Sequence, residues 1–270
     1  MKNKFFIILS IVFFFLNANS EEEIIFKATE INILDEGNLI RAKKGSEVIL
    51  PDNIIVISEE FEYNKLDSLL EFSKNILAED KINDLKLKTE KLKYLKNKKI
   101  LNTFGETTFL IQSDYKIDSK NVTYNKKKEL LFSKEKSKIT DTFNNQIKVD
   151  EFSYNILKNI IKTNQMEILD TDKNKYTFEN AIIDLNNKKI LGKDIVVKLD
   201  KSLFSSDNDP RFKGRSIKIS ENKTEITKGV FTICKIKKDK CPPWHMTAEK
   251  IEHNKKDKLI NYKNAWLKLY

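Results

Sequence analysis

Glycine and proline are scarce in this sequence, with 6 and 4 residues among 270. Low-complexity disorder usually needs far more of both, so the composition excludes a flexible linker-like chain. Only two cysteines and two histidines occur, which leaves room for one disulfide or one small metal site. No segment after residue 20 has the roughly 20 consecutive apolar residues that a membrane-spanning helix needs.

A recognisable catalytic constellation is also missing. No serine-based nucleophile elbow lies near His245 or His253. Paired carboxylates do not recur at the inward positions where a polysaccharide-modifying enzyme on a β-helix would need them. We therefore expect that the chain is not an enzyme and that it holds no metal and no cofactor.

The N-terminus has the three parts of a secretory signal peptide. Lys2 and Lys4 form a basic start, residues 5–16 are apolar apart from Ser10, and Ala18-Asn-Ser20 is a small-x-small cleavage site. An uncleaved membrane anchor is the alternative. We predict a signal peptide over residues 1–20 and an exported mature chain, residues 21–270, that forms one repeat domain.

Positive charge is abundant but spread out. The net charge is +10, and only Arg41, Arg211 and Arg215 are arginines, so nearly all of the basic residues are lysines. An exported chain without a basic block and interleaved aromatics is not expected to bind nucleic acid. The lysines either form a solvated face or attract an anionic ligand.

A short apolar pattern recurs about every 30 residues. Each copy is a doublet of alternating residues, soon followed by a turn-forming Asn or Asp. The doublets are Ile31/Ile33, Phe61/Tyr63, Leu92/Tyr94, Val122/Tyr124, Phe152/Tyr154, Ile183/Leu185, Ile217/Ile219 and Ile251/His253. Fixed periods of this length indicate stacked supersecondary units, and alternation bounded by turn residues indicates strands. Residues 66–80 and 84–99 have some helical periodicity, but they are in phase with the repeat and are predicted as strands.

The predicted fold is therefore all-β. About eight strand-turn-strand repeats of about 30 residues give about sixteen short strands. Each hairpin would bury one face by stacking, either between two facing sheets or in one sheet folded into a V. The result would be an elongated β-jelly-roll or solenoid with an apolar interior.

The C-terminal residues carry a more specific resemblance. The segments are Gly229-Val-Phe-Thr-Ile-Cys234, Cys241-Pro-Pro-Trp-His245, Ala248-Glu-Lys-Ile-Glu-His253 and Asn264-Ala-Trp-Leu267. Together with the repeats they resemble the N-terminal periplasmic, OstA-like domain of the outer-membrane lipopolysaccharide-assembly protein LptD. The large C-terminal barrel of that family has no counterpart in the sequence, so the chain is either truncated or a stand-alone jelly-roll.

The resemblance implies a lipopolysaccharide-transport role at the outer membrane. Such a domain would receive the lipid in the periplasm from a bridge protein of the same fold, bound by edge-strand pairing, and pass it to an outer-membrane barrel and its lipoprotein partner. The competing interpretation is a secreted structural β-solenoid, such as an adhesion repeat, with a dry core.

Three groups of candidate site residues follow. The apolar doublet residues, from Ile31 to Ile251, either line a groove for acyl chains or are ordinary core. Trp244 and Trp266 either cap the end of the interior or mark the lipid exit. Cys234 and Cys241 favour a disulfide in an oxidising compartment, with a zinc site that includes His245 and His253 as the alternative.

Overall fold

The computed structural model describes residues 23–141, 144–203, 208–235, 242–254, 256–257 and 259–270. The predicted signal peptide lies outside these residues. No helix among those described is long and apolar enough to cross a membrane. In the described residues the only helices are five single turns of 3-10 helix, η1 (Asp35–Gly37), η2 (Pro51–Asn53), η3 (Lys96–Lys98), η4 (Lys126–Lys128) and η5 (Lys201–Leu203).

Everything else of regular structure is strand, which confirms the all-β prediction. The described residues form one antiparallel sheet of 21 strands. The strands are β1 (Ile25–Leu34), β2 (Leu39–Leu50), β3 (Ile54–Ser58), β4 (Glu60–Asn64), β5 (Leu69–Asp80), β6 (Leu85–Leu95), β7 (Ile100–Thr103), β8 (Glu106–Ile111), β9 (Tyr115–Lys120), β10 (Thr123–Asn125), β11 (Leu130–Ser133), β12 (Ser137–Thr140), β13 (Gln146–Val149), β14 (Glu151–Asn155), β15 (Ile160–Leu169), β16 (Lys175–Asp184), β17 (Lys189–Lys198), β18 (Arg211–Ile219), β19 (Lys223–Thr232), β20 (Trp244–Asn254) and β21 (Leu259–Leu269).

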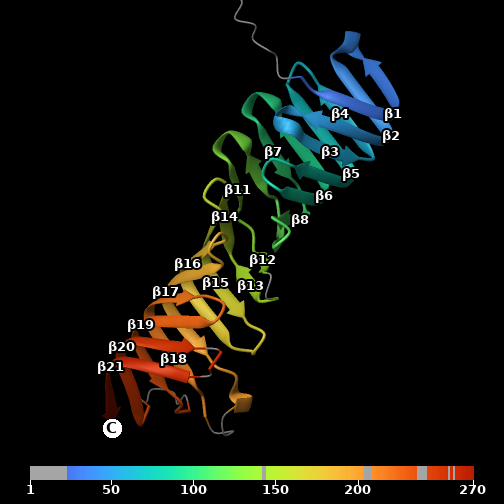
Figure 1. Cartoon of the computed structure of the whole chain (residues 1–270). Coiled ribbons are helices and arrows are strands. Elements are labelled where there is room, and N and C mark those ends of the chain that lie inside the picture. The colour runs from blue at the N-terminus through green and yellow to red at the C-terminus, as the bar shows by residue number, and fades with distance from the viewer. Residues whose placement is uncertain (1–22, 142–143, 204–207, 236–241, 255, 258) are drawn as a thin grey trace, which may run out of the picture.

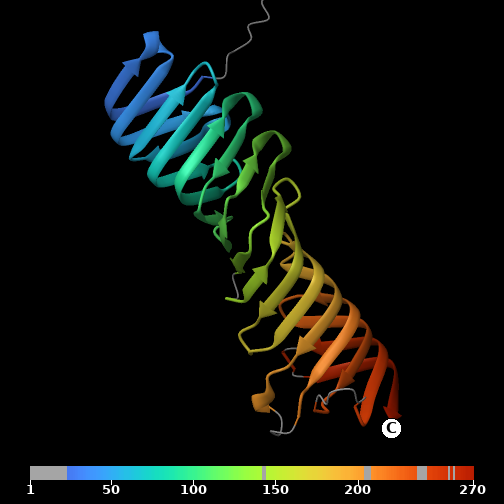
Figure 2. The same ribbon diagram turned by 180° about the vertical axis from the view of Figure 1, so that it is seen from behind.

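The sheet folds over on itself because its strands bend in the middle. One half of β2 pairs with β3 and the other half with β4, and β5 then pairs with both in the same way. Five bent strands are divided at the bend, as β3/β4, β7/β8, β9/β10, β11/β12 and β13/β14, so the 21 strands make sixteen bent strands. Figures 1 and 2 show the resulting elongated stack, with β1 at one end and β21 at the other.

The folded sheet forms two layers that face each other across the interior. The doublet layer contains β4, β10, β14 and the half-strands in register with them. The opposite layer contains β3, β8, β9, β12, β13 and their continuations. The layers are continuous through the backbone along the bend. The turns at the two free margins face each other along the other side, which we call the mouth.

The repeat doublets occupy equivalent places in this architecture. All eight lie in the doublet layer, and their side chains belong to its inner face. Cross-strand pairing forms a ladder through the tyrosines of four copies, in which Leu70, Leu101 and Leu131 separate Tyr63, Tyr94, Tyr124 and Tyr154. One repeat of about 30 residues therefore corresponds to two consecutive antiparallel bent strands.

The sixth copy is displaced by two residues relative to the other copies. Ile161 pairs with Tyr154 on one side and with Ile183 on the other. Ile183, the first member of its doublet, thus stands level with the tyrosines, while Leu185 lies just beyond the end of β16. The boundary between strand and turn is displaced by two residues here. Because side chains alternate with a period of two, Ile183 and Leu185 both still face the interior.

The turns explain how the fold forms with so little glycine. At the doublet-layer margin, Ser68, Lys99, Glu129, Asn159 and Lys188 all have φ near +50°. The backbone carbonyls of Ser68, Lys99, Glu129 and Asn159 each accept a hydrogen bond from the next turn along the stack, at 2.9–3.0 Å. This ladder between turns offsets the conformational cost of the left-handed residues.

Asparagine and aspartate side chains close several of these turns. The Oδ1 atoms of Asn64, Asn125, Asn155, Asp184 and Asn254 each accept a hydrogen bond from the backbone N–H three residues later, at 2.9–3.2 Å. These side-chain turns explain the Asn that follows most doublets in the sequence.

Candidate functional site

The interior between the layers is a continuous apolar core. Most doublet residues are nearly completely buried there, including Leu92, Val122, Phe152, Ile217 and Ile251. They pack with inner-face residues of the opposite layer into one cluster that runs the length of the stack. The side chains at mid-stack fit closely, since Tyr154 and Ile117 have no exposed surface. Acyl chains could lie here only where the layers separate.

The doublet of the first strand is placed differently. Ile31 and Ile33 pair with Ala42 and Ile40, which are buried, so both isoleucines face the interior side of β1. They are nevertheless 41% and 67% exposed, because within the described residues β1 has a neighbouring strand on one side only. The interior is therefore open to solvent at this end.

The opposite end is also open and apolar. Leu267 and Leu269 on β21 are 57% and 74% exposed. They pair with Met246 and Trp244, and the indole of Trp244 meets the Phe231 ring edge-on at 6.2 Å. These contacts place Trp244 on the inner face, at the end of the core.

The structure separates the two tryptophans. Trp266 pairs with Thr247, next to the pair formed by Ala265 and the buried Ala248, so its indole is on the outer face of β21. Its side chain is 61% exposed. A shared end cap of Trp244 and Trp266 is not formed, because adjacent residues of a strand point to opposite faces.

The cysteine prediction is only partly within the described residues. Cys234 is half-buried, and its Sγ lies 3.7 Å from the carbonyl oxygen of Trp244. Cys241 lies outside the described residues, so the disulfide stays a prediction. His245 and His253 lie eight residues apart on β20, in opposite layers. They do not converge on one zinc ion.

Polar contacts join the two margins of the mouth. Lys99 in the doublet layer binds Asp52 of the opposite layer at 3.1 Å, and Lys188 binds Asp114 at 3.4 Å. Between them, the amide of Gln112 donates to Asn159 at 3.1 Å. The lysines of these ion pairs come from the doublet layer and the aspartates from the opposite layer.

The strongest of these contacts is buried. Lys126 in η4 donates to Asp80 Oδ2 at 2.9 Å, and the two side chains are only 7% and 1% exposed. The hydroxyl of Tyr124 donates to the same oxygen at 2.6 Å. Lys126 also binds Glu129 at 3.1 Å, and Asn83 donates to Asp80 and Glu129. Every charged group of this cluster thus has several partners.

The ionisation of the cluster follows from these contacts. Burial by itself would raise the pKa of Asp80, but the hydrogen bonds from Tyr124, Lys126 and Asn83 outweigh burial and lower it. Burial would likewise lower the pKa of Lys126, but its bonds to Asp80 and Glu129 raise it. Burial and the neighbouring Asp80 raise the pKa of Tyr124. Asp80 and Lys126 are therefore charged, and Tyr124 neutral, over the whole physiological range.

Farther toward the C-terminus, a cleft of about 220 Å³ opens in the mouth. Its walls include Tyr115 and Asp170 of the opposite layer, with Lys188, Lys189 and Glu221 on the doublet-layer margin. Burial and nearby aspartates raise the pKa of Tyr115 to about 12. Bridging contacts and hollows therefore alternate along the mouth. A further hollow of about 800 Å³ borders the doublet-layer margin near its N-terminal end, at Lys65, Lys99 and Lys127.

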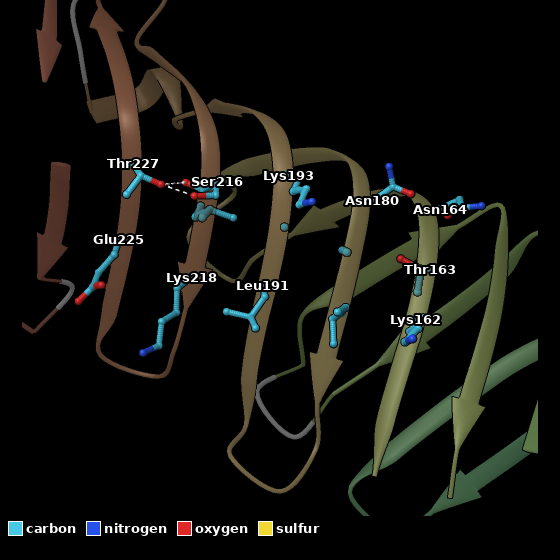
Figure 3. A pocket seen from close by; sticks show the side chains of 14 residues that line it. Lys162, Thr163, Asn164, Asn180, Leu191, Lys193, Ser216, Lys218, Glu225 and Thr227 are labelled. Carbon is cyan, nitrogen blue, oxygen red and sulfur yellow. Dashed lines mark hydrogen bonds between the residues drawn. The ribbon is translucent and has the colours of Figure 1, made fainter. Parts of the chain in front are cut away.

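Another hollow lies on the outer surface of the doublet layer (Figure 3). It measures about 630 Å³ and lies over β15–β19, with Ile182 and Leu191 among its apolar residues. Lys162, Lys193 and Lys218 stand around it. Its lining combines outward-facing residues such as Ile182 and Leu191 with the buried Ala181 and Ile217 of the neighbouring strand positions.

The sequence reasoning missed the mouth contacts. Asp80, Lys126 and Glu129 are ordinary turn-region residues in the sequence, and their partners are one and a half repeats away. The sequence does contain one signal: acidic residues follow the opposite-layer strands, whereas lysines follow the second to sixth doublets. Only the pairing of the margins shows that these two sets meet.

Comparison with known proteins gives little further guidance. No protein-family model matches the chain. No curated protein matches it. Among solved structures, one similar chain is LptH of Pseudomonas aeruginosa, described as the LptA-homologous periplasmic component of the conserved lipopolysaccharide transport device. The match has 10% identity and a TM-score of 0.21, and covers 64% of this chain and 83% of that one. Values this low say nothing about what the present chain binds.

Proposed function

We propose that this chain is a periplasmic lipopolysaccharide-transport domain that accommodates acyl chains between its two layers. The observation that carries the proposal is the inner apolar face, which runs without interruption from the open end at β1 to the open end at β21. A core that ends in exposed isoleucines and leucines is unusual for a closed domain, because exposed apolar patches normally mark interaction sites.

The physical basis is the transfer of acyl chains out of water. Each buried CH2 group contributes about 0.8 kcal/mol, without any specific side chain. Sugars and phosphates of the lipid would stay outside, near the lysines of the doublet-layer margin. Lys99, Lys127 and Lys188 provide positive charge along this margin, and attraction between such charges and an anionic lipid favours this orientation.

The open ends suggest how the lipid would arrive and leave. β1 and β21 each have a free edge within the described residues. An edge strand of a bridge protein with the same fold could pair with β1 and continue the apolar face, by β-augmentation. The lipid would leave at β21 toward an outer-membrane barrel and its lipoprotein partner, as the resemblance to the LptD domain implies.

Site-specific photo-cross-linking tests the proposal. A benzoylphenylalanine at Phe152, which is buried on the inner face, should capture lipopolysaccharide supplied as micelles. The same residue at Lys127 or Asn187, both exposed in turns, should capture much less. Equal capture at all three positions would argue against an interior site.

A second candidate function is a secreted structural β-solenoid. The close packing at mid-stack, where Leu92, Ile117 and Tyr154 are fully buried, favours it. Such a protein would hold its layers together permanently. Extraction of the purified protein distinguishes the two, because a lipid carrier should yield bound glycolipid, whereas a dry solenoid should yield none and show no capture at Phe152.

A further inference from the structure

The contacts across the mouth form a regular series. Asp52 meets Lys99, Asp80 meets Lys126, and Gln112 meets Asn159, with sequence separations of 47, 46 and 47 residues. In these three contacts the opposite-layer turn is aligned with the doublet-layer turn one and a half repeats later, whereas Asp114 binds Lys188 of the following doublet-layer turn. The contact is a property of the stack, repeated from turn to turn.

Several of the residues in these contacts have a left-handed backbone conformation. Asp52, Lys99, Gln112 and Asn159 all adopt left-handed conformations, with φ between 50° and 63°. Left-handed residues cost conformational energy in L-amino acids, roughly 1 kcal/mol each. The Asp52–Lys99 and Gln112–Asn159 contacts therefore share a backbone geometry, which the Asp80–Lys126 pair does not have.

The mouth is the side on which the layers can separate. Along the bend the layers are joined by the backbone of every long strand, whereas at the mouth they are joined by side chains. A lipid with several acyl chains and a sugar-phosphate headgroup cannot move lengthwise through the packed interior with its headgroup inside. Its headgroup must stay in the mouth while its chains lie between the layers.

We infer that the mouth contacts are a latch that an anionic headgroup opens. Phosphate groups of the amphiphile take Lys99 and Lys188 from Asp52 and Asp114, and the layers separate enough to admit the chains. The buried Asp80–Lys126 pair closes the middle of the mouth and is the last to open. This inference rests on the proposed function and adds to it the entry route and the residues that control it.

Chemistry favours the lysines as the exchanging partners. An ammonium group is a compact charge with three N–H donors, which can donate equally to a carboxylate or a phosphate oxygen. The ion pairs at the two outer positions are partly exposed, with side-chain exposures of 19% and 35% for Lys99 and Asp52, and 48% and 41% for Lys188 and Asp114. An incoming phosphate can therefore reach them from solvent.

A reversible cross-link across the mouth tests the latch. In a Cys234→Ser/Cys241→Ser background, Gln112→Cys and Asn159→Cys are joined by a short reducible linker, and capture of lipopolysaccharide by benzoylphenylalanine at Phe152 is followed over time. We expect capture to slow at least about tenfold, because a closed mouth limits access to Phe152, and to recover when the linker is cleaved.

A second cross-link serves as the control. Glu59 and Asn75 are exposed and hydrogen-bonded at the bend, at 2.5 Å. Linking Glu59→Cys to Asn75→Cys should leave capture at Phe152 unchanged, because the layers are already joined there.

A charge-reversal pair tests the ion pairs without a linker. Asp52→Lys removes the attraction to Lys99 and keeps the lysine, so capture should speed up about two- to fivefold, the factor that corresponds to one exposed ion pair. The double variant Asp52→Lys/Lys99→Asp restores an ion pair between two positions that are both left-handed, and capture should return to near the original rate.

The outcomes separate the two claims. Equal capture rates in the mouth-linked and unlinked proteins, or no change with Asp52→Lys, would overturn the latch while leaving interior binding intact. Absence of capture at Phe152 in the unlinked protein would overturn the proposed function, and the latch with it. Slower capture with the mouth linker, but not with the bend linker, supports both.

Discussion

Removing the Asp80 carboxylate should destabilise the whole stack, because that side chain joins its two layers. Asp80 accepts hydrogen bonds from Lys126 at 2.9 Å, Tyr124 at 2.6 Å and the Asn83 amide at 2.8 Å. Its other oxygen accepts the backbone N–H groups of Ile82 and Asn83, at 3.1 and 3.2 Å. Asp80→Ala therefore leaves several buried donors without their acceptor.

The expected loss can be bounded. Breaking a buried ion pair by removing one partner typically costs about 3–5 kcal/mol. Lys126 keeps Glu129 as a partner, at 3.1 Å, so we expect a value near the lower bound, about 3 kcal/mol. For a chain of this size that corresponds to a fall in Tm of about 6–12 °C.

Urea denaturation followed by circular dichroism measures the loss. Lys116→Ala is the matched control, since its ion pair with Asp118 is exposed and should contribute at most about 1 kcal/mol. Replacing both partners, as Asp80→Asn/Lys126→Met, should cost less than the sum of the single variants. A loss below about 1 kcal/mol for Asp80→Ala would refute the view that this cluster joins the layers.

Four further outcomes are expected. Since the pKa of Asp80 is lowered in the folded protein, the stability difference between wild type and Asp80→Asn should be complete above about pH 4 and vanish as the pH falls through the folded pKa, in denaturation curves from pH 2 to 7. Gly192→Ala would place a Cβ 2.2 Å from the Phe178 ring, so it should cost about 1–3 kcal/mol by overpacking, and Phe178→Leu in the same chain should recover part of this. Ser68→Gly, at φ +52°, should raise the free energy of unfolding by about 0.5–1 kcal/mol and Tm with it; a fall in Tm would contradict the left-handed conformation of this residue. Thiol titration of residues 21–270 without reductant should find no free cysteine if Cys234 and Cys241 are paired, and two reactive thiols would disprove the pairing.

The all-β stack could be predicted from the sequence because its signal is local and repeated. Alternation of two residues determines which side chains share a face, and the recurring Asn determines where each strand ends. Tyr94, Tyr124 and Tyr154 were therefore predicted on one inner face, where the structure places them. Residues 66–80 and 84–99 were also correctly predicted as strands, β5 and β6.

Features that depend on the bend could not be predicted in this way. Alternation continues through Gly45, and at Glu59 it only shifts by one residue, from Ser58 to Phe61 on the inner face. Neither pattern shows that one half of a strand lies opposite the other half. Ile183 and Leu185 fit the same alternation in either register, and only pairing with Ile161 shows which is level with the tyrosines. The outer position of Trp266 likewise depends on its register with Thr247.

The contacts across the mouth are the feature that the sequence predicts least well. They are also the feature that depends most on the identity of individual side chains. An apolar interior can accept any acyl chain, because transfer from water depends on buried area and hardly on side-chain identity. Conservative exchanges such as Ile117→Leu should therefore change lipid selection little. The Asp52–Lys99 and Asp80–Lys126 pairs depend on charge, distance and the alignment of turns 46–47 residues apart. If the chain discriminates between lipids, the discrimination has to arise at the mouth, where the headgroup and these charges meet.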